Sequence, residues 1–499
     1  MIVLVLSLFS WAVVPDELWG RDTDDSLCKK SVVRFSVQQR SPDFYRPWLK
    51  SNPIEVTGTG FVIAGQRILT NAHVVNYGSQ IYVQLHDSDQ KLEAHVVAIA
   101  HDLDLALLRL DDASALENVP SLELSEGIPA LRTEISVLGF PLGGNQMSIT
   151  KGVLSRVEYS QIAYGRFAMR LQVDAAVNPG NSGGPGIADG KVIGIVFATF
   201  SGGENIGYLV HASEIGRFLR DIEDGKYDGA PRHWLYYQTV ENSALRAKLQ
   251  LPKNLGGVRV REVLWPLGED SPLRRGDVIT RIGPHEIDSQ GKVRVEGLQL
   301  PFEYYCPVVC QDGKIPFTIW RDGKQEEVSY PAPSTTPMLL PSVSGTYPKY
   351  FILGPLAFET ATLELVANLQ MSPTTITGLA NINSPLMGKN GLPAKSADEE
   401  LVIVPNVPFT HNLMKGYNVG ALQTVKSVNG VGIRNLRQLA KLFLESTDEY
   451  FEIEFNESSV PIMVFNREDF LRSTDSILED NSIRDQYSPE LADIFRKSQ

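Results

Sequence analysis

The fold of this chain is limited most by a succession of short β-type runs between about residues 31 and 220. Glycine, asparagine, aspartate and proline separate the runs, and these residues favour turns between strands. The runs are VVRFSV from Val32, GTGFVI from Gly58, IYVQL from Ile81, HVVAIA from His95, ISVLGF from Ile135 and KVIGIVFA from Lys191. Many short strands with turns between them are typical of a β-sandwich or β-barrel. The segment SEIGRFLRDIEDG from Ser213 is then expected to form a helix that closes this first domain.

Two later segments of the chain repeat one order of predicted elements. The earlier of the two contains GVRVREVL from Gly257, SPLRRGDVITRIG from Ser271 and IPFTIWRDGK from Ile315. The later one contains KYFILGPLAF from Lys349, LMKGYNVGALQTVKSVNGVGI from Leu413, NLRQLAKLFLES from Asn435 and FEIEF from Phe451. We interpret the two segments as diverged copies of one module. A length of 499 residues agrees with about three domains of ordinary size.

Composition excludes several classes of function. The chain has 59 acidic and 46 basic residues and a net charge of −13, so nothing indicates the basic surface that nucleic-acid binding needs. It has no G-x-x-x-x-G-K-[ST] phosphate-binding loop, and we expect no nucleotide-dependent step. The three cysteines, Cys28, Cys306 and Cys310, are too few for a disulfide framework and lack the second ligand pair of a zinc site. We therefore expect no metal and no other cofactor.

The chain begins with an apolar run from Ile2 to Val14, which is shorter than the roughly 20 residues that a membrane-spanning helix needs. This length suits the core of a signal peptide, although no Lys or Arg precedes it and no clear small-x-small cleavage site follows. A buried first strand and an uncleaved anchor are the alternatives. We expect an exported protein, periplasmic or otherwise, with an organelle or the cytoplasm as alternative compartments.

The most informative string in the sequence is DAAVNPGNSGGP, which contains Ser182. Its glycines at 180, 183 and 184 can adopt backbone conformations that other residues avoid. A tight loop of this kind can direct the amides of Gly180, Asn181 and Ser182 at an oxyanion that develops during acyl transfer. Ser182 is therefore the candidate nucleophile.

A serine nucleophile needs an imidazole to take its proton and a carboxylate to orient that imidazole. His73 lies in RILTNAHVV, where an apolar strand runs into a turn of small residues. Asp104 lies in HDLDLALLRL at the start of another apolar strand, with His101 and Asp102 as rivals. Strand alternation favours Asp104, because Leu103, Leu105 and Leu107 would share the opposite face.

These strings resemble the HtrA/Deg (protease Do-like) serine proteases, which couple a trypsin-like protease domain to PDZ domains. TNAHVV, DLALL and GNSGGP match the His, Asp and Ser motifs of that family in order and spacing. GFPLGG from Gly139, KGVLS from Lys151 and ENIGYLV from Glu204 also look like family segments. The resemblance covers about residues 30 to 470 and is closest to the plant-type Deg branch. It implies a mainly β protein, with a trypsin-like double β-barrel followed by two PDZ-like α+β modules.

The resemblance also divides the chain into domains. It predicts a protease domain at residues 28–225, a PDZ-like domain at 230–335, and a diverged PDZ-like domain with an insertion at 345–470. Residues 1–20 would be the hydrophobic leader, and residues 471–499 a C-terminal tail.

By the same resemblance, the chain is an ATP-independent serine endopeptidase that cleaves unfolded or damaged proteins. A chaperone or scaffold with weak proteolysis is the alternative. The partners would be unfolded proteins, peptides and further copies of the chain in a trimer-based oligomer. Val177 and Thr199 would line the specificity pocket. Both are modest in size and neither is acidic, so we expect a preference for small or medium apolar side chains rather than Lys or Arg.

PDZ domains add a ligand strand to a sheet edge and bind its terminal carboxylate with a glycine-containing loop. In the first PDZ-like segment, the predicted peptide-binding loop contains Leu255, Gly256, Gly257 and Val258. In the second, it contains Gly354 and Leu356, but Pro355 between them removes one amide and a long insertion follows. We expect a structural or oligomerisation role of the second module to be at least as plausible as ligand binding.

Overall fold

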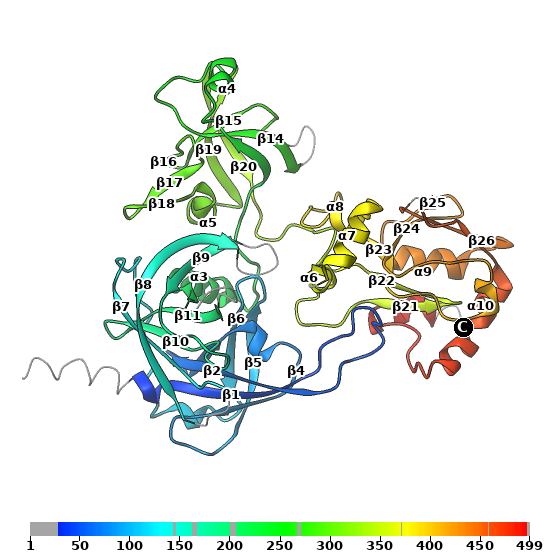
Figure 1. Cartoon of the computed structure of the whole chain (residues 1–499), viewed down its shortest axis with the longest axis horizontal. Coiled ribbons are helices and arrows are strands. Elements are labelled where there is room, and N and C mark those ends of the chain that lie inside the picture. The colour runs from blue at the N-terminus through cyan, green and yellow to red at the C-terminus, as the bar shows by residue number, and fades with distance from the viewer. Residues whose placement is uncertain are drawn as a thin grey trace, which may run out of the picture.

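The computed structural model of the protein describes residues 28–142, 146–161, 167–199, 206–266, 271–370, 372–457 and 459–496. The predicted leader therefore lies outside the described residues. The chain is mainly β, as expected, and forms three parts (Figure 1): a pair of barrels, a middle module of residues 234–331, and a C-terminal module of residues 350–496. Among the described residues, no helix has both the length and the apolar character to cross a membrane.

The first barrel closes in the order β1-β2-β3-β6-β5-β4 through antiparallel pairs. Its strands are β1 (Val32–Gln39), β2 (Ile54–Ile63), β3 (Arg67–Thr70), β4 (Gly78–Gln84), β5 (Leu92–Ala100) and β6 (Leu105–Leu110). The short helix α2 (Ala72–Val75) joins β3 to β4, and η2 (Ala113–Leu116) follows β6.

The second barrel closes in the order β10-β11-β12-β9-β8-β7. Its strands are β7 (Glu134–Gly139), β8 (Ser148–Gln161), β9 (Phe167–Val173), β10 (Pro185–Ala188), β11 (Lys191–Thr199) and β12 (Gly207–His211). The predicted closing helix is α3 (Ala212–Asp221), followed by η3 (Ile222–Asp224). One apolar cluster with residues from both barrels, including Leu69, Leu105, Leu138 and Ile195, joins them. The Ser182 loop and the His73 helix therefore belong to different barrels that share a core.

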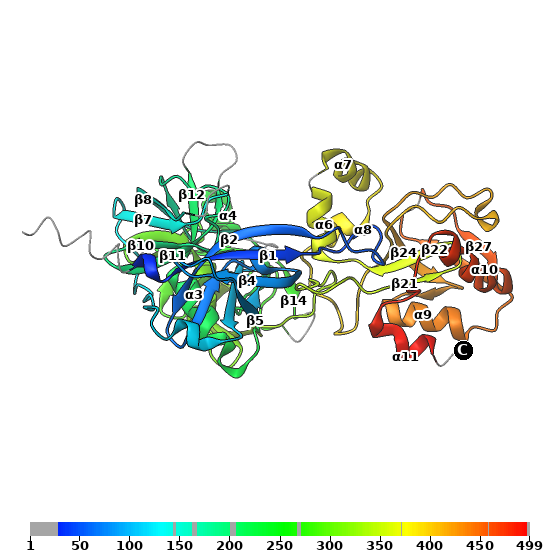
Figure 2. The same ribbon diagram turned by 90° about the horizontal axis from the view of Figure 1, so that it is seen from below.

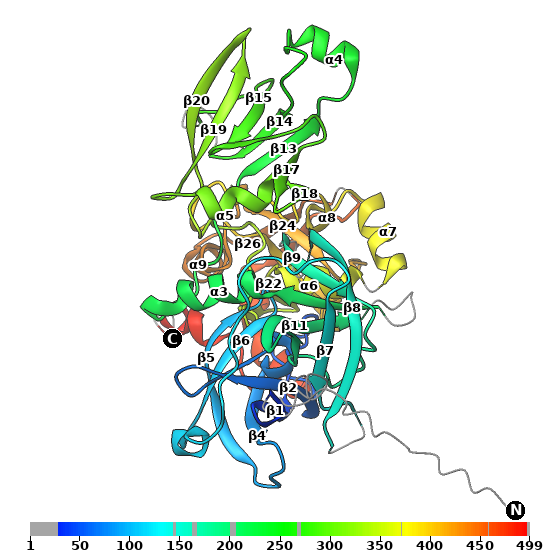
Figure 3. The same cartoon turned by 90° about the vertical axis from the view of Figure 1, so that its left-hand side faces the viewer.

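The middle module is a sheet in the order β13-β14-β15-β19-β20, with β16 paired to β15. Its strands are β13 (Trp234–Thr239), β14 (Val258–Trp265), β15 (Val278–Ile282), β16 (His285–Glu286), β19 (Lys314–Arg321) and β20 (Lys324–Pro331). A separate hairpin contains β17 (Lys292–Val295) and β18 (Leu298–Pro301), and the helices are α4 (Ser243–Lys248), η5 (Phe302–Tyr305) and α5 (Cys306–Val309). In Figure 3 this module stands above the barrels. Met169 of β9 packs into its core, so the module is anchored on the second barrel.

The C-terminal module is a sheet in the order β21-β22-β23-β24-β26-β27, with β25 paired to β24. Its strands are β21 (Tyr350–Leu353), β22 (Leu356–Thr360), β23 (Val402–Val404), β24 (Gln423–Val428), β25 (Val431–Gly432), β26 (Tyr450–Phe455) and β27 (Met463–Asn466). Its helices are α6 (Leu363–Gln370), α7 (Pro373–Asn381), α8 (Pro385–Gly388), η6 (Asn412–Met414), α9 (Leu436–Glu445), α10 (Arg467–Asp480), η7 (Pro489–Leu491) and α11 (Ala492–Phe495).

The two modules have the same strand order, which agrees with their interpretation as diverged copies. The series β13, β14, β15, β19 and β20 corresponds to β22, β23, β24, β26 and β27, and β16 corresponds to β25. The C-terminal module has one additional strand, β21, beyond β22. Strand β13 therefore lies at the edge of the middle module, whereas its equivalent β22 is covered by β21 in the C-terminal module.

The expectation of a C-terminal tail from residue 471 is wrong. Helix α10 extends to Asp480, and Phe470 and Ile477 on this helix are almost fully buried. Leu491, Ile494 and Phe495 belong to the main apolar cluster of the C-terminal module. The polar composition of this segment hid a regular apolar spacing, which buries one face of each helix.

The connection between β1 and β2 extends from the first barrel to the C-terminal module. Figures 1 and 2 show both strands continuing out of the barrel as a long blue arm that ends beside β21 and α6. Phe44 of this arm belongs to an apolar cluster with Leu339, Leu365 and Ile403. The barrels and the C-terminal module therefore share an apolar contact within one chain.

Candidate active site

His73 is held at the edge of the first barrel by hydrogen bonds to the short helix that carries it. The side-chain amide of Gln39 on β1 donates to the carbonyls of His73 and Val74, both at 2.9 Å. Asn71, fully buried just before the helix, donates from its side chain to the Asp104 carbonyl at 2.9 Å. These contacts fix the direction of α2 against the start of β6, which Asp104 immediately precedes.

The structure brings His73 and Asp104 into direct contact. Nδ1 of His73 lies 2.7 Å from Oδ2 of Asp104, and the His73 backbone amide donates to Oδ1 at 2.9 Å. Asp104 has φ of +54°, a left-handed conformation that non-glycine residues adopt mainly where the surroundings hold them. Both carboxylate oxygens are thus used to orient the imidazole.

The contact with Asp104 favours the protonated form of His73. Burial alone would lower the pKa of His73, but the hydrogen bond and negative charge of Asp104 outweigh it, and the pKa lies above its ordinary value. The side chain of His73 remains 47% exposed, whereas that of Asp104 is 13% exposed. The imidazole therefore has one edge open to a substrate and one edge fixed by the carboxylate.

The rival carboxylate, Asp102, has a different partner. The hydroxyl of Tyr227 donates to Oδ1 of Asp102 at 2.8 Å. Tyr227 follows helix α3, so Asp102 ties the end of the protease barrels to the segment beyond them. Of these two aspartates, Asp104 accepts the hydrogen bond from the His73 side chain.

The Ser182 loop is packed tightly against the first barrel. Gly183 has φ of +86°, and a Cβ there would lie 2.1 Å from the Thr59 carbonyl and 3.1 Å from the Asn71 nitrogen. The Thr59 amide donates to the Ser182 carbonyl at 2.9 Å, and the Thr59 hydroxyl to the Gly180 carbonyl at 2.7 Å. The loop therefore lies beside the residues that immediately precede His73.

Thr59 was not predicted from the sequence as a residue of this site. It lies in the GTG string of β2, and a Cβ at Gly58 or Gly60 would clash with Val74 or Phe35. Two glycines that flank a polar residue on a barrel strand indicate close approach of another segment, and this signal could have identified it.

The expected oxyanion amides do not all remain free. The Asn181 amide donates to the Asn178 carbonyl at 3.0 Å, so it is already used within the loop. Within the part of the chain that the structure describes, the amides of Gly180 and Ser182 have no such acceptor. Of the three predicted donors, Gly180 and Ser182 are therefore more available than Asn181, and the oxyanion-binding role of this loop stays a prediction.

Comparison with known proteins identifies the parts of this chain. The family described as trypsin-like peptidase domain matches residues 58–195, and the PDZ domain family matches residues 341–490. The chain is 32% identical to protease Do-like 4, mitochondrial, of Arabidopsis thaliana over 453 residues, which cover 90% of this chain and 83% of the relative. The chain belongs to the Do-like (HtrA/Deg) protease family. It is a serine protease.

A second curated relative supports the same family. The chain is 31% identical to protease Do-like 2, chloroplastic, of Arabidopsis thaliana over 477 residues, which cover 94% of this chain and 77% of the relative. Among solved structures, the HtrA-type protease AlgW with tripeptide is 24% identical, with a TM-score of 0.49, and the match covers 62% of this chain and 96% of that one.

The two predicted specificity residues of the Do-like protease lie around Gly207. Val177 is 9% exposed, and a Cβ at Gly207 would lie 2.4 Å from its Cγ2. The backbone of Thr199 pairs with Gly207 between β11 and β12, but the Thr199 side chain lies outside the described residues. Val177 thus packs against β12 of the second barrel, and its place in a specificity pocket stays a prediction.

The predicted peptide loop of the middle module does not lead to a free edge. Gly256 and Leu255 help to line a cavity of about 680 Å³, but Val258 begins β14, which pairs with both β13 and β15. An interior strand has no hydrogen-bonding side left for a peptide. In the described part of the chain, β13 and β20 are the outer strands of this sheet, so a free edge next to β14 belongs to β13, and peptide binding by residues 255–258 stays a prediction.

The predicted loop of the C-terminal module is covered by helix α10 and strand β21 of the same module. The Gly354 amide donates to the Thr474 hydroxyl of α10 at 2.9 Å, and a Cβ at Gly354 would lie 2.7 Å from the Phe470 ring. Leu356 is fully buried in the core, and β21 occupies the edge of β22. Gly354 and Leu356 are thus packed against other parts of the module, and their role in binding a peptide stays a prediction.

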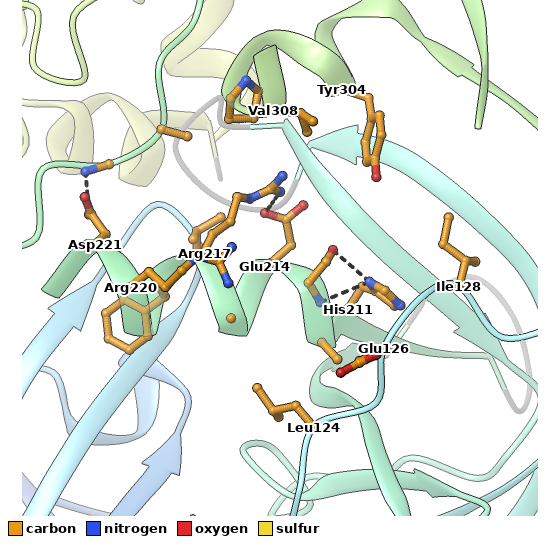
Figure 4. A pocket seen from close by; sticks show the side chains of 18 of the residues that line it. Leu124, Glu126, Ile128, His211, Glu214, Arg217, Arg220, Asp221, Tyr304 and Val308 are labelled. Atoms are coloured by element: carbon orange, nitrogen blue, oxygen red, sulfur yellow. Dashed lines mark hydrogen bonds and ion pairs between the residues drawn. The ribbon is translucent and has the colours of Figure 1, made fainter. Parts of the chain in front are cut away.

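A cavity of about 940 Å³ lies between helix α3 and the middle module, away from His73, Asp104 and Ser182. Figure 4 shows the buried Glu214–Arg217 ion pair on α3 facing Tyr304 and Val308 of the middle module. Glu214 also accepts the Met169 amide at 2.8 Å, and burial lowers the pKa of the adjacent His211 to about 4. The charged groups of this cavity therefore hold helix α3 at the junction with the middle module.

Proposed function

We propose that this Do-like protease is an ATP-independent endopeptidase that hydrolyses unfolded or damaged proteins with the triad His73, Asp104 and Ser182. The observation that carries the proposal is the 2.7 Å contact between His73 and Asp104, beside the glycine-rich loop of Ser182. A carboxylate that holds the imidazole on one side leaves the other side for the serine hydroxyl.

In this reaction, the Ser182 hydroxyl adds to the scissile carbonyl while His73 takes its proton. Asp104 fixes the tautomer of His73 and stabilises the imidazolium. The amides of Gly180 and Ser182 donate to the oxyanion, and each such donor contributes about 10²–10³ in rate. The imidazolium then protonates the leaving amine, and water hydrolyses the acyl-enzyme by the same steps in reverse order.

We propose that the specificity pocket, with Val177 and Thr199 on its walls, accepts small or medium apolar side chains. The support is the buried apolar side chain of Val177 next to Gly207. Neither residue is acidic, so a Lys or Arg side chain would lose its hydration without gaining a charged partner. Cleavage of casein should therefore follow Ala, Val or Thr more often than Lys or Arg.

We propose that peptides bind at β13 of the middle module, where an added strand can complete the sheet. The free side of an edge strand is the surface that PDZ domains use. The C-terminal module would act instead in structure or assembly, and a trimer-based oligomer of this chain stays our expectation. Sedimentation of the full chain measures that state.

We propose an organelle as the compartment rather than the periplasm. The support is that relatives matching most of this chain carry the names mitochondrial or chloroplastic. Cell fractionation of the tagged full-length protein tests the proposal.

The test of the catalytic proposal compares wild type with Ser182→Ala on unfolded casein. We expect cleavage to be lost while the fold and oligomer size stay the same. A fluorophosphonate probe should label wild type and fail to label His73→Ala. Undiminished cleavage by Ser182→Ala would overturn the proposal, and an absence of labelling in wild type would favour a scaffold.

A further inference from the structure

The C-terminal module contacts the first barrel close to the proposed triad. The arm between β1 and β2 inserts Phe44 among apolar residues of the C-terminal part and places Trp48 against its sheet. The Trp48 ring lies 6.4 Å from that of Tyr350 and 5.5 Å from that of Phe409. Two large apolar side chains of the barrel therefore depend on this contact for their burial.

A second contact runs through the segment 342–347, which precedes β21 and is called the docking segment below. Its Tyr347 hydroxyl donates to the Arg40 carbonyl at 2.9 Å, and the Lys50 ammonium lies 3.9 Å from the centre of the Tyr347 ring. The ring of Tyr77 lies 6.1 Å from that of Tyr347. Tyr347 thus joins the docking segment to both the arm and the residues after α2.

Gly345 of the docking segment lies between two residues of the first barrel. A Cβ at Gly345 would come within 2.9 Å of Asn76 Oδ1 and 3.1 Å of His101 Nε2. The φ of Gly345 is +78°, a conformation that favours glycine. A side chain at position 345 would therefore push against the side chains of Asn76 and His101 and require them to shift.

Asn76 and His101 each adjoin a segment that carries a triad residue. Asn76 is the C-cap of α2, and its amide donates to the Ala72 carbonyl at 2.8 Å, so it closes the single turn that contains His73. His101 begins the turn that ends at Asp104, whose left-handed backbone conformation is held by its neighbours. Gly345 therefore touches the end of both segments.

The docking segment is itself held rigidly by helix α6. Glu364, which is 6% exposed, accepts a hydrogen bond from the Ser342 hydroxyl and another from the Val343 amide at 3.0 Å. Burial lowers the pKa of His101, while the charge of Glu364, the Ser344 backbone and the charges of Asp102 and Asp104 oppose that shift. A neutral His101 ring packs against Gly345 without adding a second positive charge near His73.

We infer that Asn76 and His101 are positioning residues of the proposed triad, and that Gly345 of the C-terminal part holds them in place. Docking of the C-terminal module then aligns Asp104 with His73, and undocking releases the alignment. This inference rests on the proposed function of His73, Asp104 and Ser182. Its consequence is that the C-terminal module acts on catalysis within one chain, without binding a peptide.

The test compares Gly345→Ala with Gly391→Ala in the full chain. Gly391 has a nearly identical φ of +77°, but a Cβ there meets nothing within 4 Å, so it reproduces the backbone strain without the contact. We expect Gly345→Ala to lower kcat on a peptide substrate by about 10–100-fold with KM within about twofold, because misalignment affects the reaction more than binding. Gly391→Ala should retain the wild-type kcat.

The pH profile separates positioning from a general loss of structure. Asp104 raises the pKa of His73, so weaker contact between them should move the acid limb of kcat/KM to lower pH in Gly345→Ala. Glu364→Gln, which weakens the hold on the docking segment, should shift both quantities in the same direction by less. If Gly345→Ala fails to fold, Glu364→Gln alone decides the question.

Equal kcat and an equal acid limb in Gly345→Ala, Glu364→Gln and Gly391→Ala would overturn the inference. That outcome would leave the triad intact, provided that Ser182→Ala is inactive in the same assay. Activity of Ser182→Ala would instead refute the proposed function on which the inference rests.

Discussion

The middle and C-terminal modules share their strand order but differ at the edge where a peptide would add. In the described part of the middle module, β13 pairs on one side only. In the C-terminal module, the equivalent β22 pairs with β21, and β21 is hydrogen-bonded on its other side to the segment after α10. The Ile352 amide donates to the Gln486 carbonyl at 2.8 Å, and the Ser488 amide donates to the Tyr350 carbonyl at 2.9 Å. One copy leaves this edge open, and the other covers it with a strand of its own.

This difference explains how the C-terminal module can serve as a rigid body against the barrels. An unsatisfied edge is a surface for other chains, whereas a covered edge is part of the fold. The arm of the first barrel then packs beside β21 through Trp48 and Tyr350. The closed edge and the docking contact are thus neighbouring features of one module.

The largest effect should come from removing a buried aromatic side chain from the core of the C-terminal module. Phe470 is fully buried between the rings of Phe443, Phe451 and Phe465 and lies over Gly354. Phe470→Ala should lower the free energy of unfolding of this module by about 3–5 kcal/mol, measured by denaturant titration. Arg472→Ala on the exposed face of the same helix should change it by less than about 0.5 kcal/mol. Equal effects of the two substitutions on the free energy of unfolding would mean that packing of α10 through Phe470 does not stabilise the module.

A second test asks which edge accepts a peptide. With a saturating decapeptide that ends in apolar residues and a free carboxylate, we expect amides of β13 to exchange about 10-fold more slowly in hydrogen–deuterium exchange. Amides of β21 and β22 should be protected already and should not respond. Protection that appears at β22 and not at β13 would reverse the comparison between the two modules.

A smaller effect should come from Glu359, which is fully buried on β22 of the closed edge. Neither of its carboxylate oxygens has a hydrogen-bond partner among the described residues, and burial, followed by the charge of Asp43 on the arm, raises its pKa well above the ordinary value. A raised folded-state pKa means that stability is full below the unfolded pKa, near 4.5, and falls as pH rises toward the folded value.

Glu359→Gln removes the charge at nearly constant shape. It should therefore raise the melting temperature at pH 8, by about 2–4 °C for each kcal/mol relieved, and match wild type near pH 4. Thermal unfolding at the two pH values measures this difference. A lower melting temperature for Glu359→Gln at pH 8 would show that the carboxylate has a stabilising partner.

Local patterns predicted much of this structure. Each of the six strand runs of the first domain coincides with a strand, apart from Leu85 and Phe140 one residue past a strand end, because each run combines apolar residues with flanking turn residues. The settings of His73 and Asp104, each next to an apolar strand, placed both residues where two strands of one barrel meet. Such features depend on neighbours in sequence, and sequence patterns describe them well.

Pairing between distant segments was not predictable in the same way. Whether β14 or β13 forms an edge depends on which strands pair across the sheet, and the glycines before Val258 carry no information on that. The direction of the Asn181 amide depends on dihedral angles of a loop rather than on residue type. The side chains of Phe470, Thr474 and Ile477 are buried on one face of α10. Their spacing of four and three residues was a usable signal of a packed helix.

The most direct test of the account compares Asp104→Asn with Asp102→Asn in kcat/KM on a peptide substrate. Asp104 is hydrogen-bonded to the His73 ring, whereas Asp102 accepts a hydrogen bond from Tyr227. We predict a loss of about 10³–10⁴-fold for Asp104→Asn, because an amide favours the wrong tautomer of the imidazole. Asp102→Asn should stay within a few fold of wild type. A loss in Asp102→Asn that equals or exceeds the loss in Asp104→Asn would contradict the proposed triad.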